Sequence, residues 1–401
     1  MIIDTVYIII ALSLALWFPS LYLRNNEKRY LSQLQWLIGY HFFFGVVFYF
    51  FTRNGGGDAW GYWTIAREMS YEDFKFFLFQ GEGTGFMQAF NYFFANVLNM
   101  GFLANTLFYT MLGSFGLVFF FLIAIRSIPY NFKFRGISLF PVVFYLPNLH
   151  FWSAGLGKDT LLFLCVAMFA YALQSPMKRI VLLAVSITLS YLIRPHITLF
   201  MFLAFGLSYL ISRKIPVFRR VVFSILLVGA SIVILPQVLD FIKVDTFTAE
   251  ALSDRAETQA GYLSARSGSG VDISSYPFPL QVLTFLFRPL FFDANNFRAL
   301  LSSFDNLLLL LLSILAFRYK LWSTFKTAPF VVKAFLLFGI VGTIAFAPTL
   351  GNLGIMIRQK NMFTPGILIY MLWSFSRQTE AMYAKVLNAA RVEDGKLPDA
   401  G

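Results

Sequence analysis

The polar motif that most clearly suggests chemistry follows the second apolar segment of the chain. Three glycines, Gly55 to Gly57, precede Asp58, and Trp60 and Tyr62 follow it. Glycine permits tight backbone turns, so we expect the Asp58 carboxylate to lie at a membrane boundary beside aromatic rings. A carboxylate there can take the proton of a sugar hydroxyl while rings pack on the sugar face. The motif predicts a catalytic Asp58 with substrate-binding Trp60 and Tyr62; the alternative is an interfacial turn with aromatic anchors.

Two further motifs lie in very short connections between apolar segments. Lys158 and Asp159 follow a glycine-rich turn, where exposed backbone amides and a lysine could hold a phosphate. Arg194, Pro195 and His196 join two apolar runs almost without a loop. An arginine so close to hydrocarbon is costly and is usually functional or paired. We predict that these four polar residues bind substrate; a helix cap with a snorkelling lysine, and a hinge histidine, are the alternatives.

Basic residues also occur in the last two predicted outer loops. Arg288 precedes a proline in a short apolar stretch, and Arg358 and Lys360 precede the final apolar segment. Arginine matches the geometry of a phosphate group better than lysine does. We predict that all three contribute to binding an anionic substrate, although each could instead be an interfacial side chain that snorkels to the membrane surface.

Composition excludes several common classes of protein. Hydrophobic residues make up 58% of the chain and charged residues 13%, which is typical of a membrane protein. The net charge of +12 consists mostly of predicted cytoplasmic anchors, so we predict contact with membrane lipids and not with nucleic acid. The three histidines and one cysteine have no metal-ligand spacing. We predict no cofactor; a divalent metal held by Asp58 with Asp159 or Asp293 is the alternative left open.

The elements that must position these residues are transmembrane helices. Since about 20 apolar residues cross a bilayer, we predict an all-α polytopic membrane protein with about eleven crossings, near 3–23, 32–52, 103–125, 136–152, 159–175, 179–194, 196–212, 219–240, 300–317, 329–348 and 360–377. Two shorter apolar stretches, 86–100 and 279–292, are expected to be interfacial or half-helices on the outer face. Residues 1–380 form the predicted membrane domain, with long outer loops at 53–102 and 241–299, and residues 381–401 form a partly disordered tail.

In this layout, basic and acidic residues are distributed unequally between the loops on the two sides of the membrane. By count, 20 of the 32 Lys and Arg residues, but only 5 of the 20 acidic residues, fall in the short loops on one side and in the tail. The positive-inside rule makes that side cytoplasmic, with the N-terminus outside and the C-terminus inside. The candidate polar motifs then all face outward.

Two motifs resemble a known enzyme class. The segment from Gly57 to Ala66, with Asp58 and Tyr62 in it, resembles the first-outer-loop signature of GT-C-type glycosyltransferases, except that their Asp follows the first crossing. The segment from Arg358 through Lys360 to Pro365 is similar to their late basic motif. The layout also resembles bacterial polysaccharide polymerases of the Wzy and EpsG type.

This resemblance implies a GT-C-like fold and a donor sugar linked to a polyprenyl phosphate or pyrophosphate in the outer leaflet of a bacterial inner membrane. The acceptor would be a glycan or a lipid. Asp58 would then act as the general base, and Arg194, Arg358, Lys158 and Arg288 would neutralise the leaving phosphate. Two alternatives belong to other classes: a transporter or flippase of a lipid-linked glycan, and a non-catalytic scaffold of an envelope assembly.

Overall fold

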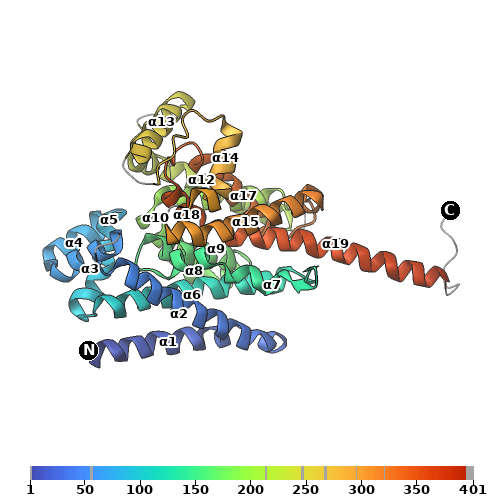
Figure 1. Ribbon diagram of the computed structural model, residues 1–401, viewed down its shortest axis with the longest axis horizontal. Coiled ribbons are helices and arrows are strands. Elements are labelled where there is room, and N and C mark those ends of the chain that lie inside the picture. Colours follow the sequence, from blue (N-terminus) through green and yellow to red (C-terminus); the bar gives the residue numbers. More distant parts are fainter. Residues whose placement is uncertain are drawn as a thin grey trace.

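The chain folds into a bundle of packed helices (Figure 1). The structure, a computed structural model, describes residues 2–54, 57–212, 215–244, 248–265, 269–294, 296–319 and 321–393. Within these ranges almost every element is a helix, and the exception is a small hairpin of strands β1 (Lys133–Phe134) and β2 (Ile137–Ser138). The predicted all-α class is therefore confirmed.

Six helical segments in the described ranges are long and apolar enough to cross a membrane. They are α1 (Ile2–Tyr22), α2 (Leu31–Thr52) with its preceding turn, α6 (Phe102–Ser127), α10 (Ile180–Ile193) with its preceding turn, α12 (Val217–Ile242) and α15 (Phe297–Arg318). A seventh could be made by α8 (Pro147–Ala154) and α9 (Lys158–Leu173), which are bent by 106°. The apolar helices α11 (Pro195–Leu210) and α17 (Phe330–Phe346) are shorter. A helical membrane protein fits these lengths, and the count of eleven crossings stays a prediction.

The segment predicted as a crossing at 136–152 is not one helix. It begins in the hairpin and continues as α7 (Leu139–Val142), a 3-10 turn (Val143–Tyr145) and α8. Pro141 and Pro147 explain the breaks, because proline cannot donate the backbone hydrogen bond that continues a helix. The expectation of one continuous helix over these residues is therefore wrong.

This broken segment nevertheless runs beside α2 in the same direction. Rings of the two segments pair in the same order along both chains: Tyr30 with Phe140, Tyr40 with Tyr145, and Phe48 with Phe151. The segment consequently carries the chain from one end of α2 to the other, as a crossing would.

Both long loops that were predicted to face outward contain short helices. The loop after α2 holds α3 (Asp58–Glu68), α4 (Tyr71–Gln80) and α5 (Thr84–Tyr92) with a π-helical turn, and the loop after α12 holds α13 (Ala249–Ala265) and α14 (Phe278–Phe287). The stretches expected to be short outer helices, 86–100 and 279–292, are thus short helices here. Helices α3 to α5 lie near the N-terminus, at the left of Figure 1.

Contacts at the ends of helices define two ends of the bundle. At one end, Arg126 in the last turn of α6 pairs with Glu27 between α1 and α2 at 2.8 Å. The hydroxyl of Ser376 accepts a hydrogen bond from the backbone N–H of Tyr130 at 2.9 Å there. At the other end, the Asp4 carboxylate accepts one from Gly101 N–H at 2.7 Å. Two of the loops predicted to be cytoplasmic, near residues 24–29 and 126–130, therefore lie at the end opposite the Asp4 contact, together with Ser376 of α19.

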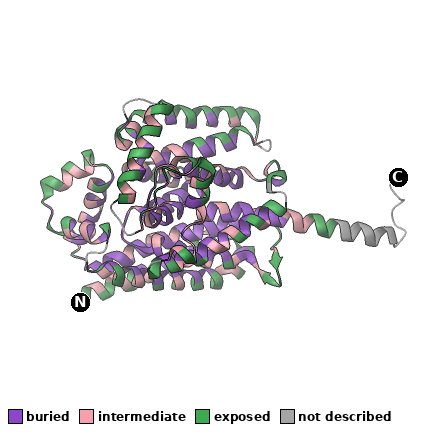
Figure 2. Cartoon of the chain, turned by 45° about the horizontal axis from the view of Figure 1, so that its top comes forward, coloured by how far each residue is buried: buried purple, intermediate pink, exposed green. Residues whose placement is uncertain are grey.

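Buried residues concentrate in α6 and α9, which form the centre of the bundle, whereas α1 and α12 keep exposed apolar faces (Figure 2). Such exposed faces are what a bilayer would cover. The last elements are α16 (Leu321–Phe325), α18 (Leu353–Lys360) and α19 (Thr364–Glu393). Because α19 is unbroken across residue 380, the predicted tail begins inside a helix, and residues 394–401 lie outside the described residues. The division into domain and tail stays a prediction.

Candidate functional site

Asp58 is the first residue of α3, and the conformation of Gly57 places it there. Gly57 has φ of +80°, a value that side chains with a Cβ adopt only with strain. Two of the three predicted turn glycines, Gly55 and Gly56, lie outside the described residues. The Asp58 side chain is 56% exposed, and its Oδ2 accepts a hydrogen bond from Arg358 Nη1 at 3.1 Å.

Asp159 lies at the start of α9, directly after the sharp turn from α8. The turn packs closely on α2: a Cβ on Gly155 would lie 2.3 Å from the ring of Phe48. The Thr160 hydroxyl closes the turn by donating to Gly155 O at 2.5 Å. This packing holds the Asp159 carboxylate, whose side chain is 8% exposed, inside the bundle.

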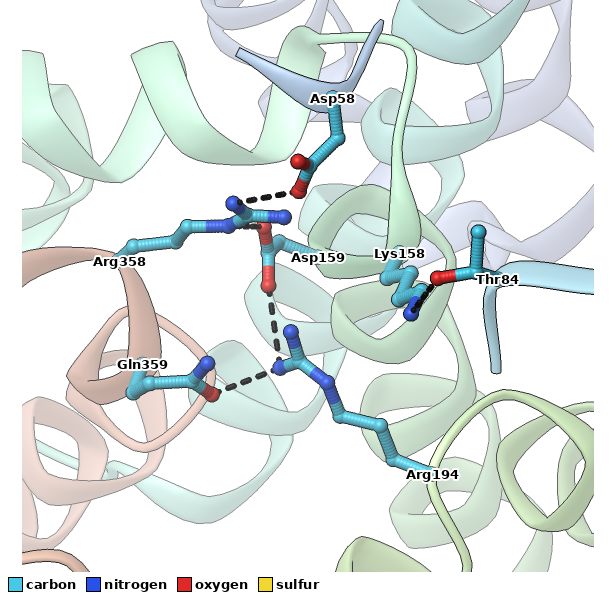
Figure 3. A network of polar contacts seen from close by, with 7 residues as sticks. All are labelled: Asp58, Thr84, Lys158, Asp159, Arg194, Arg358 and Gln359. Carbon is cyan, nitrogen blue, oxygen red and sulfur yellow. Dashed lines mark hydrogen bonds and ion pairs between the residues drawn. The ribbon is translucent and has the colours of Figure 1, made fainter. Parts of the chain in front are cut away.

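Two arginines hold the Asp159 carboxylate, one at each oxygen. Arg194, between α10 and α11, donates to Oδ1 at 3.2 Å, and Arg358 of α18 donates to Oδ2 through its Nε. Arg194 also donates to Gln359 Oε1 at 2.7 Å. Asp58, Arg358, Asp159, Arg194 and Gln359 therefore form one continuous chain of contacts (Figure 3). It joins four segments that are far apart in the sequence.

The electrostatics of this chain distinguish its two carboxylates. Burial disfavours a charged Arg358, but Asp159 and Asp58 outweigh it and raise the pKa of its guanidinium above the ordinary value. Both oxygens of Asp159 are engaged by arginines. Asp58 uses Oδ2 for its hydrogen bond with Arg358, and no hydrogen bond within the described residues occupies its Oδ1. Asp58 is thus the more exposed and less fully paired of the two carboxylates.

Lys158 and Thr84 form a second contact near this chain, and Tyr62 of α3 lies close to Asp58. Lys158 Nζ donates to the hydroxyl of Thr84 at 3.0 Å, on the far side of α9 from Arg358 in Figure 3. Burial, followed by the charge of Asp58, raises the pKa of the Tyr62 phenol to about 12. Tyr62 is therefore a protonated hydrogen-bond donor at neutral pH.

A cavity of about 530 Å³ opens over the cluster. Asp58, Tyr62, Asp159 and Arg358 line it, together with Trp152, whose ring lies 5.7 Å from the Arg358 guanidinium. Residues 269–271 line it as well, and they are fixed to the loop before α18 by backbone hydrogen bonds between Val271 N–H and Gly351 O and between Leu353 N–H and Ser269 O. The cavity therefore combines a free carboxylate oxygen, guanidinium groups and aromatic walls.

Two more arginines line the cavity from the other side. Arg288 binds Asp293 through two hydrogen bonds, of 3.0 and 2.6 Å. Arg298, near the start of α15, lies with its guanidinium carbon 3.9 Å from the centre of the Phe51 ring. Arg288 is thus neutralised in place, and Arg298 is stacked on an aromatic ring.

Five residues predicted to bind substrate do not line the cavity, and three of them, Trp60, His196 and Lys360, make their contacts elsewhere. Trp60 packs on Trp63 and Phe102. His196 is half-buried against the rings of Phe200, Phe241 and Phe346, and its buried Nδ1 has no hydrogen-bond partner among the described residues. Lys360 points away and donates to Leu286 O, Arg288 O and Asn306 Oδ1 at 3.0, 3.3 and 2.5 Å. Lys360 thereby ties α18 to α14 and α15.

Arg194 and Lys158 also lie beside the cavity and not in its lining, so the structure brings them to the site without exposing them to it. Sequence reasoning missed Gln359, Thr84, Trp152 and Arg298 as candidates. Gln359 lies between two predicted residues and Trp152 within a motif already noted, so position alone could have included them. Nothing in the local sequence marks Thr84.

The carboxylates considered for a metal site are held by guanidinium groups. Asp58 and Asp159 share Arg358, and Asp293 binds Arg288. Within the described ranges, no group of three or more His, Cys, Asp or Glu side chains is placed to hold a metal ion. The arrangement as it stands suits an anionic ligand better than a cation.

No family model, curated protein or solved structure matches this chain.

Proposed function

We propose that this protein is a membrane glycosyltransferase or polysaccharide polymerase that uses a sugar linked to a polyprenyl phosphate or pyrophosphate at the outer face of the membrane. One observation carries the proposal. A single cavity places the free Oδ1 of Asp58 beside guanidinium groups and aromatic rings, at one end of a helical bundle with apolar outer faces. A lipid-linked sugar phosphate has parts that match each of these three features.

In the proposed reaction, an acceptor hydroxyl oxygen attacks the anomeric carbon of the donor sugar. A bond forms between these two atoms, and the bond from the anomeric carbon to the phosphate oxygen breaks, so that the phosphate leaves with the electron pair. Asp58 Oδ1 takes the hydroxyl proton. Arg358, which has a raised pKa and remains charged, stabilises the negative charge that develops on the phosphate, with Arg288 as a further contact.

Other residues of the site act through these groups. Asp159 and Arg194 fix the direction of the Arg358 side chain, and Gln359 fixes Arg194 in turn. Tyr62 remains a donor at the cavity wall. We assign Lys158, His196 and Lys360 positioning roles, because their contacts lie outside the cavity. We retain the bacterial inner membrane, the external N-terminus, the eleven crossings and the GT-C-like fold as parts of this proposal.

A complementation assay tests the function. In a host that lacks the gene, Asp58→Asn and wild type are compared at matched protein level, with Asp254→Asn, an exposed aspartate of α13, as the matched control. We expect Asp58→Asn to abolish surface glycan while lipid-linked precursor accumulates in the outer leaflet, and Asp254→Asn to behave as wild type. Precursor held in the inner leaflet would indicate a flippase instead. Full glycan from Asp58→Asn would leave only a transporter or a scaffold.

A further inference from the structure

We propose that Arg298 binds the phosphate of the lipid-linked donor, and that the lipid enters the cavity sideways through a groove between α2 and α15. This inference rests on the proposed function for the identity of the lipid. Its physical basis is the distribution of charge in the cavity and the packing of three helices.

Charge in the cavity lining is compensated everywhere except at Arg298. Asp293 neutralises Arg288. Asp58 and Asp159 are neutralised by Arg358 and by Arg194 behind the lining. Among the described lining residues, Arg298 is therefore the cation without a carboxylate partner, and its printed contact is with the Phe51 ring.

A cation held on an aromatic ring keeps its hydrogen-bond donors available. The Arg298 guanidinium carbon lies 3.9 Å from the centre of the Phe51 ring, and an attraction of a cation to a ring consumes no N–H donor. A phosphate can therefore bind these N–H groups without displacing the ring. Arg298 is also the second residue of α15, where the backbone N–H groups at a helix N-terminus favour an anion further.

The groove is formed by helices that share a neighbour. Helices α2 and α15 each pack against α8, and Arg298 reaches from α15 to Phe51 of α2 above it. The cavity wall at this place is apolar, with Phe48 and Phe51 from α2, Phe151 from α8 and Leu301 from α15. A chain that leaves the cavity here thus meets hydrocarbon-like surface and not water.

Helices α2 and α15 also expose large apolar side chains elsewhere along their lengths. Phe43 and Phe50 on α2 are 60% and 56% exposed, and Phe304 and Leu311 on α15 are 57% and 53% exposed. Both helices are long and apolar enough to span a membrane. The prenyl tail can therefore stay in the bilayer while its phosphate reaches Arg298 and the sugar enters the cavity.

Binding of a short analogue tests the inference without any need for turnover. The full chain is reconstituted in nanodiscs, and binding of farnesyl phosphate is measured by native mass spectrometry, with farnesol and inorganic phosphate as separate probes. The variant is Arg298→Gln. The matched control is Arg67→Gln, because Arg67 of α3 also lies over an aromatic ring, Trp63 at 5.1 Å, but outside the cavity.

We expect Arg298→Gln to weaken farnesyl phosphate binding by about tenfold or more, as loss of charged hydrogen bonds would, while Arg67→Gln binds as wild type. Equal binding by Arg298→Gln and wild type would overturn the inference and leave the catalytic proposal intact. Equal affinity of the wild type for inorganic phosphate would refute the lipid groove. If farnesyl phosphate binding depends on Arg298 but the Asp58→Asn variant still makes full glycan, the phosphate site stands and the proposed sugar transfer is refuted.

Discussion

Removal of the Asp159 carboxylate should destabilise the protein more than any other single change in the contact chain. Its side chain is 8% exposed and separates two arginines, Arg194 and Arg358. In Asp159→Ala, Arg358 would keep Asp58 as its anion. Arg194, which is 10% exposed, would keep only the neutral oxygen of Gln359. A buried charge left without its counter-ion costs about 3–5 kcal/mol of stability.

Asp58, the exposed carboxylate of the same chain of contacts, provides a comparison for the stability loss expected in Asp159→Ala. Asp58 is 56% exposed and makes one contact with Arg358, and exposed pairs of this kind contribute about 0.2–1 kcal/mol. We therefore expect a stability order of wild type, then Asp58→Asn close below it, then Asp159→Ala far below both. Removing Arg194 as well should recover part of the loss, because the unpaired cation is then absent.

Thermal unfolding in one detergent, at equal protein concentration, measures this order. The set is Asp58→Asn, Asp159→Ala, Arg194→Ala, the double variant Asp159→Ala with Arg194→Ala, and Asp254→Ala as the exposed control. Equal midpoints for Asp58→Asn and Asp159→Ala would refute the bridging role of Asp159. A double variant that falls by the full sum of its two single changes would show that Asp159 and Arg194 are not coupled.

Three other predictions use the same material. Gly155→Ala should lower stability by about 1–3 kcal/mol, because its Cβ would lie 2.3 Å from the Phe48 ring. Gly157→Ala should be nearly neutral in thermal unfolding, because its Cβ would meet nothing within 4 Å. The pKa of Tyr62 is raised to about 12, so the stability that its neutral phenol contributes should be complete below about pH 10 and lost as pH rises towards about 12. Tyr62→Phe should remove this alkaline loss of stability. An unchanged loss of stability at high pH in Tyr62→Phe would contradict the prediction. Arg126→Gln should lower the unfolding midpoint, because it leaves the buried Glu27 carboxylate unpaired. It should leave farnesyl phosphate binding as in wild type, because this ion pair lies at the opposite end of the bundle. Weaker binding would show that the two ends are coupled.

Much of the site followed from the sorting of charge in the sequence. Asp58, Asp159, Arg194 and Arg358 come from four separate segments, and alternation of apolar spans predicted that all four face the same side. The structure brings them into direct contact. Polar residues at the ends of long apolar helices must lie near one of two ends, so charge counting reduces their placement to a choice of side.

The direction of each side chain could not be predicted in the same way. Arg358, Gln359 and Lys360 are consecutive, yet they reach Asp159, Arg194 and Asn306 respectively, because successive helical residues point about 100° apart. The rotation of α18 about its axis depends on packing that a single sequence does not reveal. The same reason applies to His196, which turns towards Phe241 and not into the cavity.

Hydropathy also failed to anticipate the broken segment at 136–152. Its composition is apolar enough for a crossing, but Pro141 and Pro147 divide it into short helical segments that pack against α2. The role of Arg298 depends on which acids neutralise the other arginines, and that pairing exists only in the folded protein.

The most direct test of the central claim is the rate of sugar transfer by Asp58→Asn. Membranes from the deletion host carrying wild type or Asp58→Asn at equal level would receive radiolabelled lipid-linked sugar, and its transfer to glycan would be followed over time. Loss of a general base predicts a rate at least about 100-fold below wild type, with farnesyl phosphate binding retained. A rate within about twofold of wild type would contradict the assignment of Asp58 as the catalytic base.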